Sequence, residues 1–355
     1  MLADLAVPLL RCLDPETAHR VTIRALSAGL GPSTKDWVPD VRLGQYLFGL
    51  RFPHPVGIAA GFDKDAEAFA GALKLGAASI EVGTMTPRPQ QGNPRPRLFR
   101  LPEDGAVINR SGFNNNGLDV GVTRLGRRDR TQGIVGANVG ANKGVETPES
   151  DYAAGVRATA PLADYITINI SSPNTPDLRD LQAPGPLRAV LRAAKAARLE
   201  VTGETGPAIL LKIAPDLGDA QLEGIVGVVL DEGIEGMIVS NTTTARPAGL
   251  KGAHKGEMGG LSGAPLFEPS TAILAKTYRL TGGKLPLIGV GGIDSGATAY
   301  TKIKAGASLV QLYTALIYNG AGLVRRIAEE LGTLLDRDGY SSITEAIGVE
   351  TGTTS

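Results

Sequence analysis

From Pro55 onward, one pattern recurs along the sequence: a short run of apolar or β-branched residues, a polar or glycine-rich break, and then a helical stretch. Apolar runs that do not alternate with polar residues are typical of parallel strands covered on both faces. Eight repeats of this unit predict a (β/α)8 TIM barrel, an α/β fold whose catalytic groups lie at the carboxyl ends of the strands. The expected strands are Val56–Ala59, Ser79–Val82, Ile134–Asn138, Tyr165–Asn169, Ile209–Ile213, Met237–Ser240, Leu287–Val290 and Leu309–Tyr313.

The first forty residues carry a different pattern, which predicts an N-terminal helical extension. Asp14 followed by Pro15 is a favourable helix start, because aspartate caps the backbone and proline suits the first helical position. Helical spacing relates two sets of apolar residues, Leu2, Leu5, Leu9 and Leu13 before this start and Ala18, Val21, Ala25 and Leu26 after it. We therefore expect a hairpin of two short amphipathic helices, which either packs on the barrel or lies in a membrane interface.

The chain is expected to have three segments: the helical hairpin over residues 1–40, the barrel over 41–348 and a flexible tail over 349–355. Within the barrel, Thr86–Asn116 is too long for an ordinary connection between a strand and a helix. We expect it to fold as an inserted hairpin over the barrel mouth.

The charge balance and the rare residue types exclude several classes of function. Lys+Arg and Asp+Glu are both 36, so the chain lacks the basic excess that nucleic-acid binding needs, and small-molecule chemistry is the default. Cys12 is the single cysteine, which excludes an intramolecular disulfide and a thiolate-held metal or iron–sulfur cluster. The histidines are His19, His54 and His254, and none is expected beside a strand end, so neither a zinc site nor a histidine-based triad is predicted. The sequence shows no signal peptide and no run of about 18 apolar residues, so we expect a cytoplasmic location.

Nearly all the expected strands end in an amide, a hydroxyl, a lysine or a glycine, which favours one large polar ligand at the barrel mouth. Gly291-Gly292 and Tyr313-Thr314 follow the last two strands, where barrels of this kind bind a phosphate. "GVGG" could merely permit a tight turn, but the helix start at Ser295-Gly296 favours the phosphate site. Gly259–Gly263 would add a second glycine-rich wall. Because no GxGxxG motif opens a βαβ unit, the pattern favours flavin mononucleotide (FMN) over a dinucleotide.

A series of motifs runs through the chain in a fixed order. They are "AAGFDKD", "EVGTMTPRPQQGNPRPRLFRL", "INRSGFNN", "NISSPNTP", "LLKIAPDL", "SNTT", "GGLSG", "IGVGGIDSG" and "GASLVQLYT". Together they resemble the dihydroorotate dehydrogenase family, the flavin enzymes of pyrimidine synthesis. The resemblance extends from Leu13 to about Leu331, almost the whole chain.

The resemblance implies two sets of binding residues. FMN would be held by Ala60, Gly61, Lys64, Thr84, Asn138, Asn169, Lys212, Ser240, Gly263, Gly292, Tyr313 and Thr314. Dihydroorotate or orotate would be held by Lys64, Asn109, Arg110, Ser111, Gly112, Phe113, Asn169, Asn174, Asn241 and Thr242. Asparagine suits a ring with both N–H groups and carbonyls, because its amide donates and accepts. Lys64 would pair with the substrate carboxylate, and Lys212 would stabilise the negative charge on the reduced flavin.

Ser172 matches the catalytic base of the family. It would take the C5 proton of dihydroorotate while the C6 hydride passes to FMN, which gives orotate in the synthesis of UMP. The family has a cysteine class and a serine class, and the serine class (class 2) has an N-terminal helical extension and passes its electrons to a membrane quinone. The resemblance therefore implies a quinone partner and peripheral attachment to the cytoplasmic face of the cell membrane. We also expect a monomer that binds no metal.

Other interpretations of the same residues stay open. Lys212 could form a Schiff base in a lyase without flavin, and "SSPNTP" could be a loop that caps the next helix. A quinone- or membrane-binding protein without catalysis is a third possibility, and the presence of Lys64, Ser172 and Lys212 argues against it. Serine is a weak base at neutral pH, so Ser172 needs a relay partner, which the sequence does not identify. One departure from the family pattern is Ser240, where threonine is expected.

Overall fold

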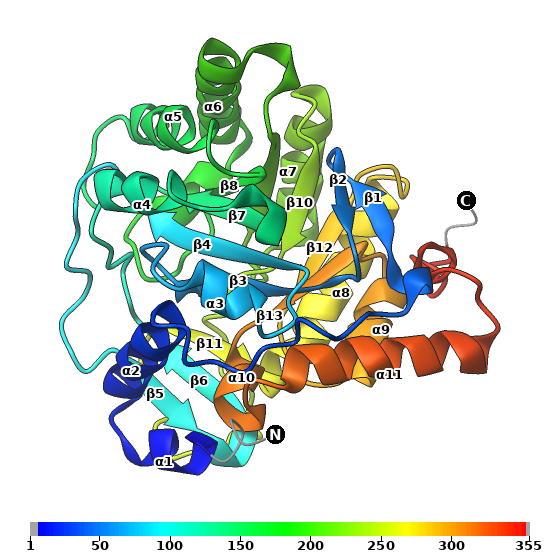
Figure 1. Ribbon diagram of the computed structural model, residues 1–355. Helices are drawn as coiled ribbons and strands as arrows, with labels where there is room; N and C mark the ends of the chain where they lie inside the picture. The colour runs from blue at the N-terminus through cyan, green and yellow to red at the C-terminus, as the bar shows by residue number, and fades with distance from the viewer. Residues whose placement is uncertain (1–5, 353–355) are drawn as a thin grey trace.

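The computed structural model describes residues 6–352 and contains a closed barrel of eight parallel strands (Figure 1). Its strands are β3 (Val56–Asp63), β4 (Ser79–Met85), β7 (Ile134–Val139), β8 (Tyr165–Asn169), β9 (Ala208–Ile213), β10 (Gly236–Val239), β12 (Leu287–Val290) and β13 (Leu309–Leu312). Pairing of β13 with β3 closes the barrel. Each expected strand overlaps one of these, so the predicted fold is confirmed.

Helices surround the barrel and bury the outer faces of its strands (Figure 1). They are α3 (Phe69–Leu73), α4 (Leu118–Leu125), α5 (Pro148–Thr159), α6 (Pro184–Thr202), α7 (Asp219–Asp231), α8 (Phe267–Leu280), α9 (Gly296–Lys304), α10 (Thr314–Asn319) and α11 (Leu323–Asp338). Short 3-10 segments cover Val41–Leu43, Pro102–Asp104, Arg130–Gln132, Leu178–Gln182, Gly203–Thr205, Ala264–Leu266 and Ile343–Ala346. Strands buried on both faces explain why the sequence shows continuous apolar runs.

A small hairpin closes the amino-terminal end of the barrel, and the sequence did not predict it. Strands β1 (Gln45–Leu47) and β2 (Leu50–Phe52) pair antiparallel. Phe52 packs against the first residues of the barrel strands, including Tyr165 and Leu309. The open end of the barrel is therefore the carboxyl end, where the polar residues lie.

The insertion over the barrel mouth folds as predicted, with one addition. Strands β5 (Leu98–Leu101) and β6 (Ala106–Asn109) form an antiparallel hairpin. Strand β11 (Gly260–Gly263), part of the segment expected to be a glycine-rich wall, pairs with β6 as a third strand. This three-stranded sheet forms a roof at the carboxyl end of the barrel.

Two helices precede the barrel, as expected, and lie beside the roof sheet (Figure 1). They are α1 (Ala6–Cys12) and α2 (Pro15–Ser27), and the Asp14 side chain accepts a hydrogen bond from the Thr17 backbone N–H at 2.9 Å. Ala18 and Leu26 are buried as the spacing predicts, but Val21 is exposed, and Ile23 takes the buried position. Leu2 and Leu5 lie outside the described residues.

The last described residues lie close to α9. The backbone N–H of Glu350 donates to the Lys304 carbonyl at 3.0 Å, and Thr351 is buried. Residues 353–355 of the expected tail lie outside the described part of the chain. Within residues 6–352, no helix combines the length and the apolar character needed to cross a membrane.

Candidate active site

A cavity opens where the carboxyl ends of the barrel strands face the roof sheet. Its walls include most of the residues that the sequence assigned to a cofactor or substrate: Ala60, Gly61, Lys64, Thr84, Asn109, Ser111, Gly112, Phe113, Asn169, Ser172, Asn174, Lys212, Ser240, Asn241, Thr242, Gly263, Gly292, Tyr313 and Thr314. The barrel brings these residues together because parallel strands place all their carboxyl ends at one rim. Asn138 and Arg110 are the two assigned residues that do not line the cavity.

Asn138 lies directly behind the cavity wall and is fully buried. Its Oδ1 accepts hydrogen bonds from Thr84 Oγ1 at 2.6 Å and from Asn169 Nδ2 at 3.2 Å. Its Nδ2 donates to Glu81 Oε1 at 2.7 Å. Asn138 therefore orients two side chains that do reach the cavity.

The guanidinium of Arg110 points away from the cavity. It donates to Glu257 Oε2 at 2.7 Å and lies 4.6 Å from the centre of the Phe99 ring. Arg110 therefore holds the loop that follows β6 and does not reach a ligand with its charge.

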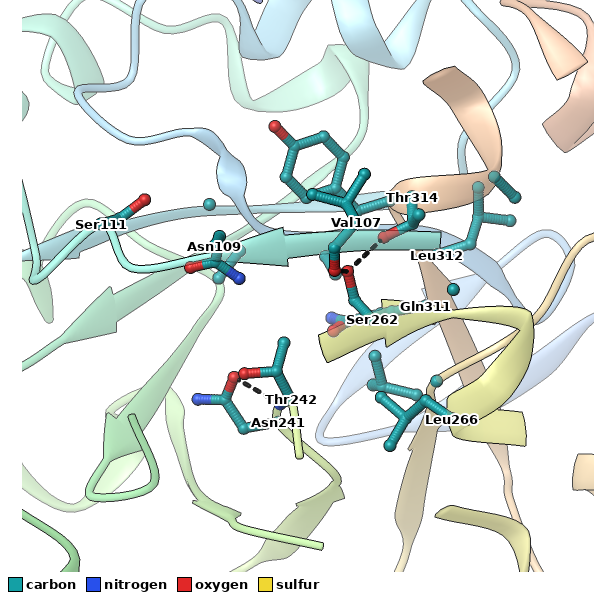
Figure 2. A pocket seen from close by; sticks show the side chains of 18 of the residues that line it. Val107, Asn109, Ser111, Asn241, Thr242, Ser262, Leu266, Gln311, Leu312 and Thr314 are labelled. Atoms are coloured by element: carbon teal, nitrogen blue, oxygen red, sulfur yellow. Dashed lines mark hydrogen bonds between the residues drawn. The ribbon is translucent and has the colours of Figure 1, made fainter. Parts of the chain in front are cut away.

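Amide side chains gather on the cavity wall from segments that are far apart in sequence. Asn174 Nδ2 donates to Asn109 Oδ1 at 3.1 Å, and Asn241 Nδ2 donates to Ser171 Oγ at 3.0 Å. Figure 2 shows Asn109 and Asn241 reaching the cavity from separate segments. Such a group can bind a ring that carries both donors and acceptors.

Two lysines contribute positive charge to the cavity. Lys64 Nζ donates to Asn114 Oδ1 at 2.9 Å, and burial together with the nearby Arg97 cation lowers the Lys64 pKa to about 8. Burial also lowers the pKa of Lys212, while Glu81 opposes this effect. Among residues 6–352, no cluster of His, Cys, Asp and Glu is placed to hold a metal ion.

Ser172 lies in the loop after β8, with its side chain buried at the cavity wall. Its Oγ accepts a hydrogen bond from the Asn174 backbone N–H at 3.3 Å. Thr175, in the same loop, has a buried hydroxyl without a hydrogen-bond partner among the described residues. The loop therefore presents two hydroxyls in a water-poor environment.

Glycines shape the end of the cavity beside β12 and β13. Gly291 and Gly292 have φ values of 115° and 72°, and a Cβ on Gly292 would lie 2.7 Å from the Phe267 backbone. Thr314 Oγ1 donates to Ser262 Oγ at 2.8 Å between α10 and the roof sheet (Figure 2). Exposed backbone N–H groups beside a hydroxyl suit a phosphate group.

Apolar residues line the cavity where it approaches α1. Leu98, Ile317 and Tyr318 line this part of the cavity, and Val107 joins them beside Ser262. The Tyr318 hydroxyl donates to the Ala106 carbonyl at 2.6 Å, and the Arg11 guanidinium of α1 lies 5.3 Å from the centre of the Tyr318 ring. The cavity therefore has an apolar end covered by the N-terminal helices.

His19 corrects the expectation that no histidine lies beside a strand end. Helix α2 places its Nδ1 3.2 Å from the Tyr313 hydroxyl, and its ring contacts Phe62 edge-on. Burial and the nearby Lys64 cation lower the His19 pKa to about 3. No local sequence pattern predicts this contact, because it depends on how α2 packs against the barrel.

The family model of dihydroorotate dehydrogenase matches residues 42–335 of this chain. The chain belongs to the dihydroorotate dehydrogenase family. A dihydroorotate dehydrogenase (quinone) from Azorhizobium caulinodans is 52% identical over 353 residues, which cover 98% of this chain and 99% of the relative. Another from Parvibaculum lavamentivorans is 53% identical over 350 residues, with 98% and 99% coverage. A crystal structure of Eimeria tenella DHODH in complex with ferulenol is 40% identical, has a TM-score of 0.91, and matches over 96% of this chain and 98% of that chain.

These comparisons confirm the predicted dihydroorotate dehydrogenase family, its quinone-dependent class, the oxidoreductase assignment and the barrel fold. The sequence-based site missed three residues that support it. Gln311 lines the cavity, and Asn114 holds Lys64. Glu81 is a fully buried carboxylate that accepts hydrogen bonds from Asn138 and Gln311. A glutamate within the apolar run of β4 could have indicated a buried polar network, because a buried charge requires hydrogen-bonding partners.

Proposed function

We propose that this protein oxidises dihydroorotate to orotate and passes the electrons to a quinone, with FMN as its bound cofactor. The observation that carries the proposal is that Ser172, Lys64 and Lys212 line one cavity together with the amide cluster. The relatives that match nearly the whole chain are named for this reaction.

The chemistry of the cavity wall fits FMN. Gly291, Gly292 and Thr314 would hold its phosphate, and Lys212 would stand near the part of the ring that gains negative charge. Gln311 Oε1 is buried without a partner among the described residues and would accept a hydrogen bond from the ring. When bound, FMN accepts the C6 hydride of dihydroorotate and carries the electrons to the quinone.

The amide cluster would orient the pyrimidine ring. Asn109, Asn174 and Asn241 offer donors and acceptors from separate segments of the chain. Lys64 would bind the substrate carboxylate, and Asn114 holds its ammonium group in place. This pairing fixes the end of the ring that carries the reacting carbon.

Ser172 would remove the C5 proton from the bound substrate. The hydrogen bond from the Asn174 N–H fixes Oγ as an acceptor, which leaves its own hydrogen free to move away as the proton arrives. The unpaired hydroxyl of Thr175 lies in the same loop and is our candidate for the relay partner. Burial excludes water that would compete for the proton.

The apolar end of the cavity would receive the quinone. Leu98, Val107 and Ile317 suit an apolar ring, and α1 and α2 form its outer cover. We also propose that these helices attach the protein peripherally to the cytoplasmic face of the cell membrane, where quinones dissolve. Leu9 of α1 is 74% exposed and is available for such a contact.

An absorption spectrum recorded before and after addition of dihydroorotate tests the proposal. The purified protein should be yellow, and its flavin band should bleach without added metal or NAD. A colourless protein in which borohydride traps a substrate on Lys212 would instead identify a Schiff-base lyase. A yellow protein whose flavin does not bleach would refute the substrate assignment.

A further inference from the structure

A buried ion pair joins helix α2 to the insertion over the barrel mouth. Arg97 Nη2 donates to Glu16 Oε1 at 2.6 Å, and Arg97 Nε donates to Glu16 Oε2 at 3.2 Å. The two side chains are only 7% and 14% exposed. A two-point contact with this burial fixes the relative orientation of its partners, unlike an exposed ion pair.

The other side of the Arg97 guanidinium holds the loop before β5. Its Nη1 donates to the backbone carbonyls of Gln91 at 2.6 Å and Asn93 at 3.0 Å. Asn93 Nδ2 in turn donates to the backbone carbonyl of Asn174 at 3.1 Å. Gly92, between Gln91 and Asn93, has a φ of 75°, and a Cβ there would lie 2.2 Å from the Ser111 carbonyl oxygen. The loop therefore has one tightly packed arrangement.

Asn174 is where this chain of contacts enters the cavity. Its backbone N–H donates to Ser172 Oγ at 3.3 Å, and its side chain donates to Asn109 Oδ1 at 3.1 Å. The path from Glu16 to Ser172 is therefore continuous through Arg97, Asn93 and Asn174.

We propose that Glu16 and Arg97 are positioning residues for the catalytic loop. Through Asn93, the N-terminal helices hold Asn174 and Ser172 in the arrangement that binds the substrate. This inference rests on the proposed function and goes beyond it, because it assigns the helices a role in the pyrimidine half-reaction as well as in quinone access.

The same helix provides a matched control. Arg20 of α2 donates to Glu67 Oε1 at 2.7 Å, which also ties the helix to the barrel. Among the described residues, the Glu67 side chain pairs with Arg20 and Arg124 and with no residue on the path through Arg97, Asn93 and Asn174. Glu67→Gln therefore weakens the attachment of α2 without entering the path from Glu16 to Ser172.

Electrostatics require a second variant, because Glu16 also raises the pKa of Lys64. Glu16→Gln would lower that pKa further and weaken carboxylate binding by charge alone. Asn93→Ala changes no charge and cuts the path next to Asn174. Measurements at pH 6.5, below the Lys64 pKa of about 8, reduce the electrostatic effect further.

The experiment compares Glu16→Gln, Asn93→Ala and Glu67→Gln in the full-length protein. Orotate affinity is titrated by the flavin absorbance, and flavin reduction by dihydroorotate is followed by stopped flow. Hydrogen–deuterium exchange over residues 170–178 is recorded without substrate. Glu16→Gln and Asn93→Ala should each weaken orotate binding about tenfold, as expected for loss of one well-placed polar contact. Both should raise exchange in the catalytic loop, and the double variant should be little worse than either single one.

Glu67→Gln should change orotate affinity less than about twofold, because its partner Arg20 is 42% exposed and the pair has no contact with the path to Ser172. The inference is overturned if Asn93→Ala binds orotate and exchanges like the wild type, or if Glu67→Gln produces the same losses as Glu16→Gln. A wild-type flavin that dihydroorotate does not reduce would instead refute the proposed function, so the two failures are distinguishable.

Discussion

Glu81 and Asn138 form a 2.7 Å hydrogen bond beneath the floor of the cavity, and the carboxylate is fully buried. Glu81 also accepts hydrogen bonds from Thr167 at 3.0 Å and Gln311 at 3.2 Å. It is the nearby anion that raises the pKa of Lys212 against the effect of burial. Glu81 thus holds residues of the cavity wall in place and partly offsets the charge of Lys212, which the cofactor would contact.

Glu81→Gln should lower the free energy of unfolding by about 1.5–3 kcal/mol, because charge-assisted hydrogen bonds become neutral and an amide group faces the Asn138 donor. Urea unfolding measures the change. The exposed Glu103→Gln should stay within about 0.5 kcal/mol of the wild type. Equal stability of the two variants would contradict a structural role for Glu81.

Ser172→Ala should retain FMN but slow flavin reduction by dihydroorotate about 10²–10⁴-fold, the usual effect of losing a general base. Stopped-flow absorbance gives the rate, and the flavin-to-protein ratio shows whether the cofactor is still bound. Reduction at a near-normal rate would remove Ser172 from the mechanism.

Orotate binding should weaken as pH rises above about 8, the value to which burial lowers the Lys64 pKa. Below that pH the ammonium group pairs with the carboxylate, and above it the neutral amine does not, so the dissociation constant should rise roughly tenfold per pH unit. Lys64→Met should bind weakly at all pH values without this dependence. The same affinity at pH 6.5 and 9.5 in the wild type would rule out the assigned role.

Lys302 is fully buried between α8 and α9, where it donates to Thr271 Oγ1 at 2.9 Å, and burial lowers its pKa to about 7. Between this value and the unfolded pKa of about 10.4, the unfolded chain binds a proton that the folded chain does not. The wild type should therefore gain stability relative to Lys302→Met as pH rises from 7 to 9, by at most ~1.4 kcal/mol per pH unit. Chemical unfolding at several pH values tests this, with the exposed Lys284→Met as control.

Leu98→Trp should slow quinone turnover several-fold and leave dihydroorotate-dependent flavin reduction within about twofold, because the larger ring fills the apolar end of the cavity. Steady-state quinone reduction and single-turnover flavin reduction separate the two effects. Val41→Trp, at an 81% exposed position, serves as control. Equal losses in both half-reactions would mean that this end does not serve the quinone.

The barrel and most of its rim could be predicted from the sequence, because both depend on local patterns. Continuous apolar runs identified every barrel strand, and the side chain that follows a parallel strand must lie at the rim. The motif from Asn169 to Asn174 was placed in this way, and the structure puts it at the cavity.

Other features depend on contacts between distant segments and left no local pattern. The β1–β2 hairpin has strands of only three residues, too short for alternation to show. Strand β11 is glycine-rich and is defined by its pairing with β6. His19 reaches Tyr313 through the packing of α2 on the barrel, which no local pattern marks. Arg110 faces away because Glu257, far along the chain, neutralises it.

Because β6 pairs with β11, the sheet that covers the site can be completed only late in the synthesis of the chain. Asn109 and Gly260 are neighbours in this sheet, although about 150 residues separate them in the chain. A ribosome must therefore release well over half of the polypeptide before the covering sheet gains its third strand. Until then, the inserted hairpin has a free edge, and a truncated product that stops before β11 would expose that edge to other chains.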